Sequence, residues 1–459
     1  MPPGTRSSKA TLANQAKEIL FLAFVTLSLT TPSVVRGPFT WLPLIRVPGQ
    51  MPGLLPTIQE TPLNLGPLAL LPGLALVAWA LARAVERPAL PWSWGRPGIS
   101  LPLAGMTLLM VIGLKPTINR RTLLTLLALG LMWWGYLFVI NERPRLTVPL
   151  SLIIVIQSAV AVGQFALQRE LGLSWLGEPP LDPQLSGTCV LLARGQRWLR
   201  AYGLGGHPNL LGALLSVLLL TIIDDVAGAR RWAQVWFTLV GSAGLLGLLT
   251  TFSRSAWLAF GLGILFWLVR RLRIVSRSDE QPGSFRLQQV SQLWRRWRRY
   301  TQFIIPMILG LAFLFSFHDL VASRFLRLET PIEARSIEDR QVDANLALQL
   351  IEQHPWTGVG VQNYLPAVRA IEPDSRAVHN VILLAAAELG LLGAALWLWL
   401  AVSGLTRPLA PGWVPWIAML TVGLFDIALF PTNSWYAAVL FGLLAAHVSL
   451  PPRPRRQTP

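Results

Sequence analysis

The chain has 459 residues, of which 53% are hydrophobic and 13% charged, and its formal net charge is +17. A soluble domain carries about 25% charged residues, so the composition indicates an integral membrane protein without a large soluble domain. The bases occur in short loops between apolar runs, as the positive-inside rule requires, and we therefore expect no nucleic-acid partner. The single cysteine, Cys189, excludes an intramolecular disulfide.

About twelve apolar segments are candidates for membrane-spanning helices, because a span needs about 20 predominantly apolar residues. They are 18–35, 66–85, 99–114, 122–141, 147–167, 208–226, 232–249, 255–269, 301–317, 378–400, 413–429 and 434–450. We expect residues 1–17 to be a cytoplasmic tail before a signal-anchor helix rather than a cleavable signal, since no clear small-residue cleavage site follows. The expected fold class is an all-α integral membrane protein, a polytopic bundle of about twelve transmembrane helices.

The loops predict the orientation of these helices. The segment 270–300 is rich in arginine and predicts a cytoplasmic loop, and the basic tail 451–459 falls on the same side. Two long segments, 168–207 and 318–377, are then external, and the second is mildly acidic. The basic residues of 115–121 are then on the external side, which the positive-inside rule disfavours.

Part of the large external loop has helical character. Residues 337–353 carry aliphatic side chains four positions apart, and Ser336 is a candidate N-cap with Asp339 three residues later. Gly358 and Gly360 then end the helix and allow the backbone to approach a partner or ligand closely.

Two arginines are candidate anion-binding groups. Arg200 precedes a Gly-rich turn and Pro208, a pattern that predicts a helix N-terminus with free N–H groups. Arg254 lies in a connection too tight for a solvated loop, on the predicted external side. A guanidinium suits phosphate, although an ordinary juxtamembrane arginine or one that reaches the interface by snorkelling also fits each position.

A histidine and two acids complete the candidate groups. His379 and Asn380 open an apolar helix, where a histidine can act as a general base or simply cap the helix. Glu388 lies inside the same apolar run and Asp426 in the eleventh segment; such acids are functional or pair with a buried base. Under the twelve-helix plan Arg200, Arg254 and His379 lie at one face of the membrane, as a charged lipid-linked substrate requires.

Four motifs follow one another in the second half of the chain. They are Arg200…Gly203…His207-Pro208-Asn209-Leu210-Leu211-Gly212, Thr251-x-Ser253-Arg254, His354-Pro355-x-x-Gly358-Val359-Gly360-x-x-Asn363-Tyr364, and His379-Asn380…Glu388-x-Gly390-x-x-Gly393. In order and spacing they resemble the O-antigen ligase and O-antigen polymerase superfamily. We therefore expect a ligase-like core over 208–450, preceded by helices and an external loop over 18–207.

The resemblance implies a GT-C-like fold with one large external loop, in the cytoplasmic (inner) membrane of a bacterium. It implies transfer of a glycan from undecaprenyl diphosphate to an acceptor hydroxyl at the periplasmic face, with inversion and without a metal or nucleotide cofactor. The acceptor is a sugar of the lipid A core or another glycan in ligases, and a second lipid-linked repeat in polymerases.

The resemblance also assigns roles to residues. His379 is the expected base, and Arg200 and Arg254 compensate the charge of the leaving diphosphate. The residues expected around the substrate are Arg340, Asn209, His207, Gly358, Gly360, Asn380 and Glu388. A polymerase remains an alternative, as does a bicarbonate-like solute transporter, although a transporter typically has repeated halves and we find no such repeat.

Overall fold

The computed structural model describes residues 8–30, 70–85, 91–114, 120–185, 187–193, 195–227, 231–276, 301–325 and 331–451. Nearly all of the regular structure in these ranges is helical. The helices are α1 (Ser8–Thr30), α2 (Leu70–Val85), α3 (Pro97–Ile112), α4 (Arg120–Glu142), α5 (Thr147–Leu167), η3 (Ser174–Leu176), α6 (Pro208–Ala227), α7 (Arg231–Thr250), α8 (Arg254–Ser276), α10 (Thr301–Ser316), α11 (His318–Phe325), α12 (Pro331–Gln353), α13 (Tyr364–Ile371), α14 (Val381–Leu405), α15 (Trp413–Gly423) and α16 (Trp435–Ser449). Strands β1 (Val190–Ala193) and β2 (Gln196–Leu199) form one antiparallel hairpin.

Each of the twelve predicted apolar segments overlaps a helix. Among the described residues, α4, α5, α6, α7, α8 and α14 contain stretches long and apolar enough to cross a membrane, and α10 with α11, bent by 77°, can form a seventh span. Helices α2, α3, α15 and α16 are apolar but shorter. The structure therefore supports an all-α, multi-pass membrane protein, whereas the count of about twelve spans is not confirmed.

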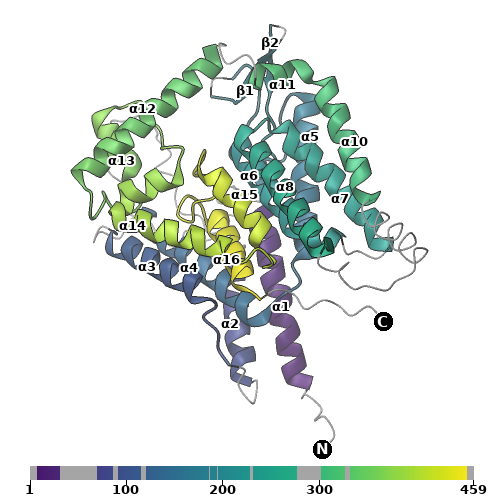
Figure 1. The fold of residues 1–459 in the computed structure, drawn as a ribbon, viewed down its shortest axis with the longest axis vertical. Coiled ribbons are helices and arrows are strands. Elements are labelled where there is room, and N and C mark those ends of the chain that lie inside the picture. Colours follow the sequence, from purple (N-terminus) through teal and green to yellow (C-terminus); the bar gives the residue numbers. More distant parts are fainter. Residues whose placement is uncertain are drawn as a thin grey trace, which may run out of the picture.

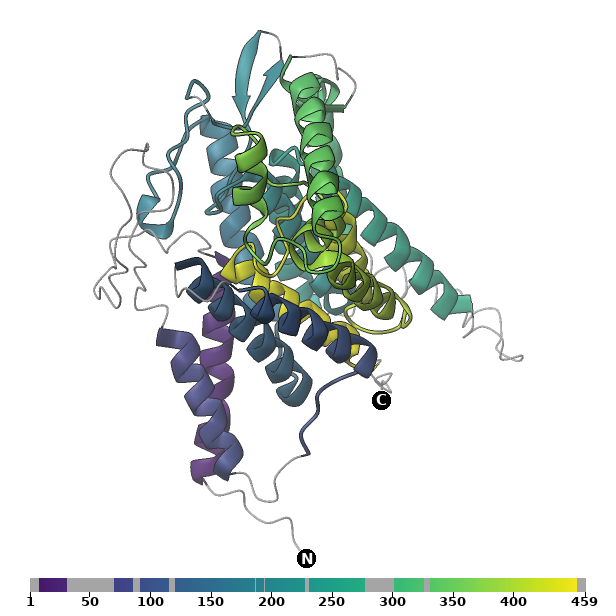
Figure 2. The ribbon, with the colours of Figure 1, turned by 90° about the vertical axis from the view of Figure 1, so that its left-hand side faces the viewer.

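The helices place the two predicted external segments at one end of the molecule. In Figure 1 the β1–β2 hairpin, α11 and the upper part of α12 lie at the top, and the first turns of α1 lie at the bottom. Figure 2 shows from the side that α1 and α2 extend together away from the hairpin. We call these the hairpin end and the opposite end. The arginines of 277–300 and of the tail, on which the predicted orientation rests, lie outside the described residues.

The large external loop is mostly helical, and one of its predicted boundaries is wrong. Helix α12 ends at Gln353 as predicted, but it begins at Pro331, so Ser336 lies inside the helix and is not its N-cap. Proline suits the first turn of a helix, because its missing N–H has no intrahelical acceptor there.

Helix α14 is not continuous, in contrast to the prediction. Gly390 has φ 72° and ψ −179°, which breaks the helix within an apolar run. Inside a membrane the freed backbone groups need protein partners. The segment 355–360 supplies them: Leu391 N–H donates to the Pro355 carbonyl (2.8 Å), and Gly360 N–H donates to the Glu388 carbonyl (2.9 Å).

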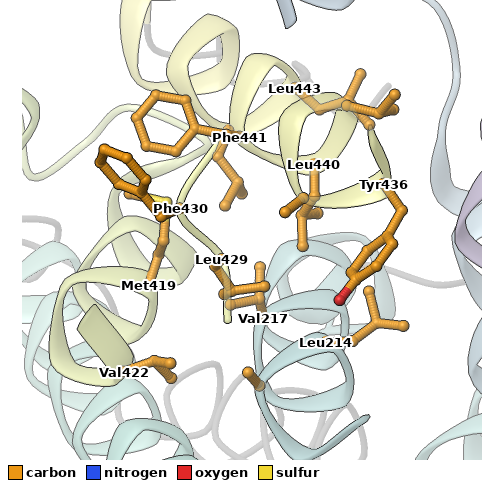
Figure 3. Close-up of a cluster of buried hydrophobic side chains, with 14 of the residues drawn as sticks. Leu214, Val217, Met419, Val422, Leu429, Phe430, Tyr436, Leu440, Phe441 and Leu443 are labelled. Carbon is orange, nitrogen blue, oxygen red and sulfur yellow. The ribbon is translucent and has the colours of Figure 1, made fainter. Parts of the chain in front are cut away.

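A buried apolar cluster fixes the chain between α15 and α16 (Figure 3). It joins α6, α15, α16 and their connecting segment through Leu214, Val217, Met419, Val422, Leu429, Phe430, Tyr436, Leu440, Phe441 and Leu443. Helix α15 ends at Gly423, so Asp426 lies in this segment and not in a helix as predicted. Asp426 Oδ1 accepts the Ala428 N–H (2.9 Å), a turn that competes with continuation of the helix.

Candidate functional site

A tight turn between α7 and α8 organises the candidate site. Its central residue, Phe252, has φ 46° and is fully buried among aromatic rings. The carbonyl of Thr251 accepts a hydrogen bond from Arg200 Nε (2.8 Å), and the carbonyl of Phe252 accepts one from Arg324 Nε (3.2 Å). The turn thus orients two arginines from distant parts of the sequence and places Arg254 at the start of α8.

Arg200 is linked to Asp426 through the side-chain amide of Asn209. Its side chain is buried, and its NH2 group donates to Asn209 Oδ1 (2.6 Å) in the first turn of α6. Asn209 Nδ2 in turn donates to Asp426 Oδ2 (3.0 Å). This chain of hydrogen bonds holds Arg200, the α6 N-terminus and the segment after α15 together.

A cavity of about 200 Å³ opens beside this network. It is lined by Asn209, Ser253, Arg254, Ser255, Leu258, Arg324, Arg340 and Phe425, so the described lining includes three arginines and no acid. The N-terminus of α8 also faces it, and a helix N-terminus presents free N–H groups to an anion. Pockets for drug-sized ligands measure roughly 300–1,000 Å³, so this cavity suits a compact anionic group.

The start of α14 separates the roles of His379 and Asn380. Asn380 is the N-cap: its Oδ1 accepts the N–H groups of Ile382 (2.9 Å) and Leu383 (3.0 Å), and its Nδ2 donates to the Leu424 carbonyl (3.1 Å). Capping is therefore performed by the asparagine, and the His379 side chain, 32% exposed, is not needed for it.

The charges around His379 link it to the arginine cavity. Burial is the largest effect on the pKa of His379 and lowers it. The charges of Asp426 and Asp343 raise this pKa, those of Arg340 and His207 lower it, and the net shift is downward. A lowered pKa favours the neutral imidazole, the form that accepts a proton. Arg340 lines the cavity and Asp426 binds Asn209, so His379 interacts electrostatically with groups in and beside the arginine-lined cavity, although it is not itself a lining residue.

His207 forms a second polar pair that the sequence does not reveal. Its Nδ1 accepts the Asn209 N–H (3.1 Å), and its Nε2 lies 3.3 Å from Cys189 Sγ. Burial opposes ionisation of the Cys189 thiol, but the hydrogen bond and charge of His207 and the charge of Arg200 lower its pKa to about 6. These residues are 18 positions apart, and only the packing of the β1–β2 hairpin end joins them.

Five of the seven predicted substrate-binding residues are not among the residues that line the cavity, namely His207, Gly358, Gly360, Asn380 and Glu388. The predicted catalytic residues Arg200 and His379 are not among them either. A Cβ on Gly358 would lie 2.3 Å from the Glu388 backbone, and one on Gly360 would lie 2.7 Å from the Gly113 carbonyl oxygen. The buried Glu388 carboxylate accepts the N–H of Tyr364 (3.4 Å). The predicted close approach of the backbone is correct, but its partners are α14 and the end of α3.

Two residues beside the site, Arg324 and Asp343, were not predicted from the sequence. Arg324 lies in the last turn of α11, and Asp343 lies on α12 beside His379. Neither belongs to a local motif. The one available signal is that Arg324 stands on the predicted external side, where the positive-inside rule disfavours arginine.

The fold and cavity define a multi-pass membrane protein with an arginine-lined cavity at one end of its helices. Residues 237–398 match the family model described as O-antigen ligase, and this match supports membership of the O-antigen ligase superfamily. The match includes Arg254, Arg324, Arg340 and His379, and excludes Arg200, Asn209 and Asp426. No curated protein gives a significant match. The family supports a membrane glycosyltransferase of the ligase or polymerase kind.

Proposed function

We propose that the chain transfers a glycan from undecaprenyl diphosphate to an acceptor hydroxyl at the periplasmic face of the cytoplasmic membrane, as O-antigen ligases do. The observation that carries this proposal is the arginine-lined cavity, whose lining residue Arg340 also interacts electrostatically with His379. The GT-C-like class, the lipid A-core or other glycan acceptor and the ligase-like core over 208–450 belong to the same proposal.

The cavity supports the binding of a diphosphate. Arg254, Arg324 and Arg340 bring three permanent positive charges to a compact space, and the α8 N-terminus adds N–H groups. Arg200 does not line the cavity but contributes indirectly, because its hydrogen bond holds Asn209 in the cavity wall. These groups stabilise the negative charge that appears on the diphosphate as it leaves, and this electrostatic effect lowers the barrier.

The proposed reaction is one displacement. The acceptor oxygen attacks the anomeric carbon of the donor glycan, and the bond from that carbon to the diphosphate oxygen breaks. The bonding electrons leave with the lipid diphosphate, and the proton of the acceptor hydroxyl passes to His379. Attack from the side opposite the leaving group inverts the anomeric configuration.

The test is the glycan profile of a deletion strain complemented with wild type, His379→Ala or His318→Ala. His318 is an exposed histidine at the same end of the molecule and serves as the control. We expect wild type and His318→Ala to restore the glycan on its acceptor, and His379→Ala to fail at an equal membrane level measured by blot.

The stalled species distinguishes the possible activities. A lost ligase leaves a bare acceptor and accumulating lipid-linked chains, whereas a lost polymerase leaves single repeats on the acceptor. Equal restoration by His379→Ala would remove the histidine from the mechanism. Unchanged glycans in the deletion strain would contradict glycan transfer, and bicarbonate uptake into proteoliposomes would then be measured.

A further inference from the structure

The buried carboxylate of Asp343 lies beside His379 and takes no part in the reaction proposed for this site. Asp343, on α12, is 3% exposed, and its Oδ2 lies 3.6 Å from His379 Nδ1. Both atoms are buried, and neither has a hydrogen-bond partner among the described residues. Buried polar atoms are almost always hydrogen-bonded, so two such atoms facing each other require an explanation.

The rest of Asp343 is firmly held. Its Oδ1 accepts the backbone N–H of Arg376 (3.3 Å), and its carbonyl oxygen accepts the hydroxyl of Tyr364 (3.1 Å). The distance between Oδ2 and Nδ1 exceeds a hydrogen bond by a few tenths of an ångström. Because the carboxylate is fixed, a small rotation of the His379 ring closes the gap.

The other charged or titratable groups near His379 interact with other parts of the site. Asp426 uses one oxygen for Asn209 and the other for the Ala428 N–H, and His207 binds the Asn209 N–H. Arg340 lines the cavity. Of these charged groups, Asp343 is the one whose unused oxygen faces a ring nitrogen.

We propose that Asp343 is a positioning residue for His379: its carboxylate accepts a hydrogen bond from Nδ1–H and so leaves the Nε2 lone pair for the acceptor hydroxyl. As that hydroxyl attacks, its proton forms the new Nε2–H bond, and the Asp343 carboxylate stabilises the resulting imidazolium. A carboxylate on the far nitrogen of a histidine fixes its tautomer in this way. The proposal rests on the proposed function.

The test variant is Asp343→Asn, and the matched control is Asp339→Asn. The amide retains the volume and an oxygen for the Arg376 N–H, but it presents N–H groups to Nδ1 and therefore favours the opposite tautomer. Asp339 lies one turn earlier on α12 and pairs with the exposed side chain of Arg376 (3.3 Å). The control therefore removes the same charge from the same helix without facing Nδ1.

The first readout is nuclear magnetic resonance of the purified full chain in detergent with labelled histidine. The chain has five histidines, and His379→Gln assigns the signal of His379. We expect the proton on Nδ1 in wild type and in Asp339→Asn, and on Nε2 in Asp343→Asn. The pKa of His379 should fall in Asp343→Asn, because the carboxylate stabilises the charged ring.

The second readout is the rate of glycan transfer against pH. We expect Asp343→Asn to lower the rate about 100-fold or more, the usual size of a lost general-base contribution. Transfer requires neutral His379, so the lower pKa also moves the acid limb of the profile to lower pH. A merely structural role would lower the rate without moving this limb.

The results separate the two hypotheses. If Asp343→Asn leaves the tautomer, the pKa and the acid limb of His379 as they are in Asp339→Asn, the positioning role is wrong. If the tautomer and pKa change as expected but the wild-type protein transfers no glycan from a lipid diphosphate, the pairing is correct and the proposed function fails.

Discussion

Basic residues at the opposite end pair with acids, whereas those at the cavity of the hairpin end gather without an acid in the cavity lining. At the opposite end, Lys17 and Arg83 bind the carboxylate of Glu142 (2.7 and 3.1 Å), and Arg270 and Arg271 both bind Asp224. At the hairpin end, Arg200 and Arg324 donate hydrogen bonds to main-chain carbonyls, and Arg200 also donates one to the amide oxygen of Asn209.

This difference separates structural from functional charge. A cation that shares a carboxylate is neutralised, and it stabilises the contact between helices. At the hairpin end, three arginines and no acid are among the residues that line the cavity, so a positive field is directed at it. We therefore expect substitutions at the hairpin end to affect glycan transfer, and those at the opposite end to affect stability.

The largest expected effect is that of Arg254→Ala. Loss of one charge that stabilises a leaving group costs about 100- to 1,000-fold in rate, so transfer should fall by that factor while the protein stays folded. The control is Arg271→Ala, which removes an arginine near the far end of the same helix, α8. Equal transfer rates in the two variants, per folded molecule in proteoliposomes, would show that the cavity does not bind the diphosphate.

At the opposite end, Glu142→Gln should lower the stability of the protein and leave the rate of glycan transfer unchanged. The amide keeps an acceptor for Trp79 Nε1 but removes the charge that Lys17 and Arg83 share. Breaking a buried ion pair costs about 3–5 kcal/mol, so the unfolding temperature in detergent should fall clearly. Transfer by the remaining folded protein should match wild type. A reduced rate without reduced stability would contradict the division between the two ends.

The break in α14 gives a third, purely conformational test. Gly390→Ala forces a side chain into positive φ with its Cβ 2.2 Å from the Trp356 carbonyl oxygen, and we expect a loss of about 2 kcal/mol or more in stability. Gly261→Ala in α8 is the control, because its Cβ meets nothing within 4 Å and alanine is favoured in a helix. If both variants unfold at the same temperature, the contact between α14 and the 355–360 segment is not rigid.

The sequence predicted what depends on local pattern. Apolar runs located the helices, and a helix N-terminus was expected at Pro208 because proline and free N–H groups have a local signature. Ser336 was misassigned because the residues before it also form helix. Asp426 was placed in a helix because the apolar run continues past Gly423, where the turn at Asp426 ends the helix.

The part of the site that the sequence could not give depends on tertiary packing. Arg324 and Asp343 lie on separate helices of the external segment, and their positions beside Phe252 and His379 follow from how these helices fold back over the bundle. The glycine prediction shows the same limit: the sequence indicates that a backbone comes close to Gly358, but not which backbone.

The smallest expected effect concerns Cys189, the one cysteine, which reports on the hairpin end without taking part in transfer. Its pKa is lowered to about 6, so alkylation by iodoacetamide should rise with pH to a midpoint near that value. His207→Asn removes the hydrogen bond and charge that favour the thiolate, and the midpoint should move toward the usual pKa of about 8.5. His318→Ala is the control and should leave it unchanged.

The labelling rate also tests whether a diphosphate reaches the cavity. The Cys189 carbonyl accepts the backbone N–H of Arg200 (3.1 Å), and Arg200 holds Asn209 in the cavity wall. A bound anion should stiffen this loop, so undecaprenyl diphosphate should lower the labelling rate at pH 6 several-fold in wild type. The change should be absent in Arg254→Ala. A ligand effect that persists in Arg254→Ala would mean that the lipid diphosphate binds elsewhere, and the contrast between the two ends would lose its functional meaning.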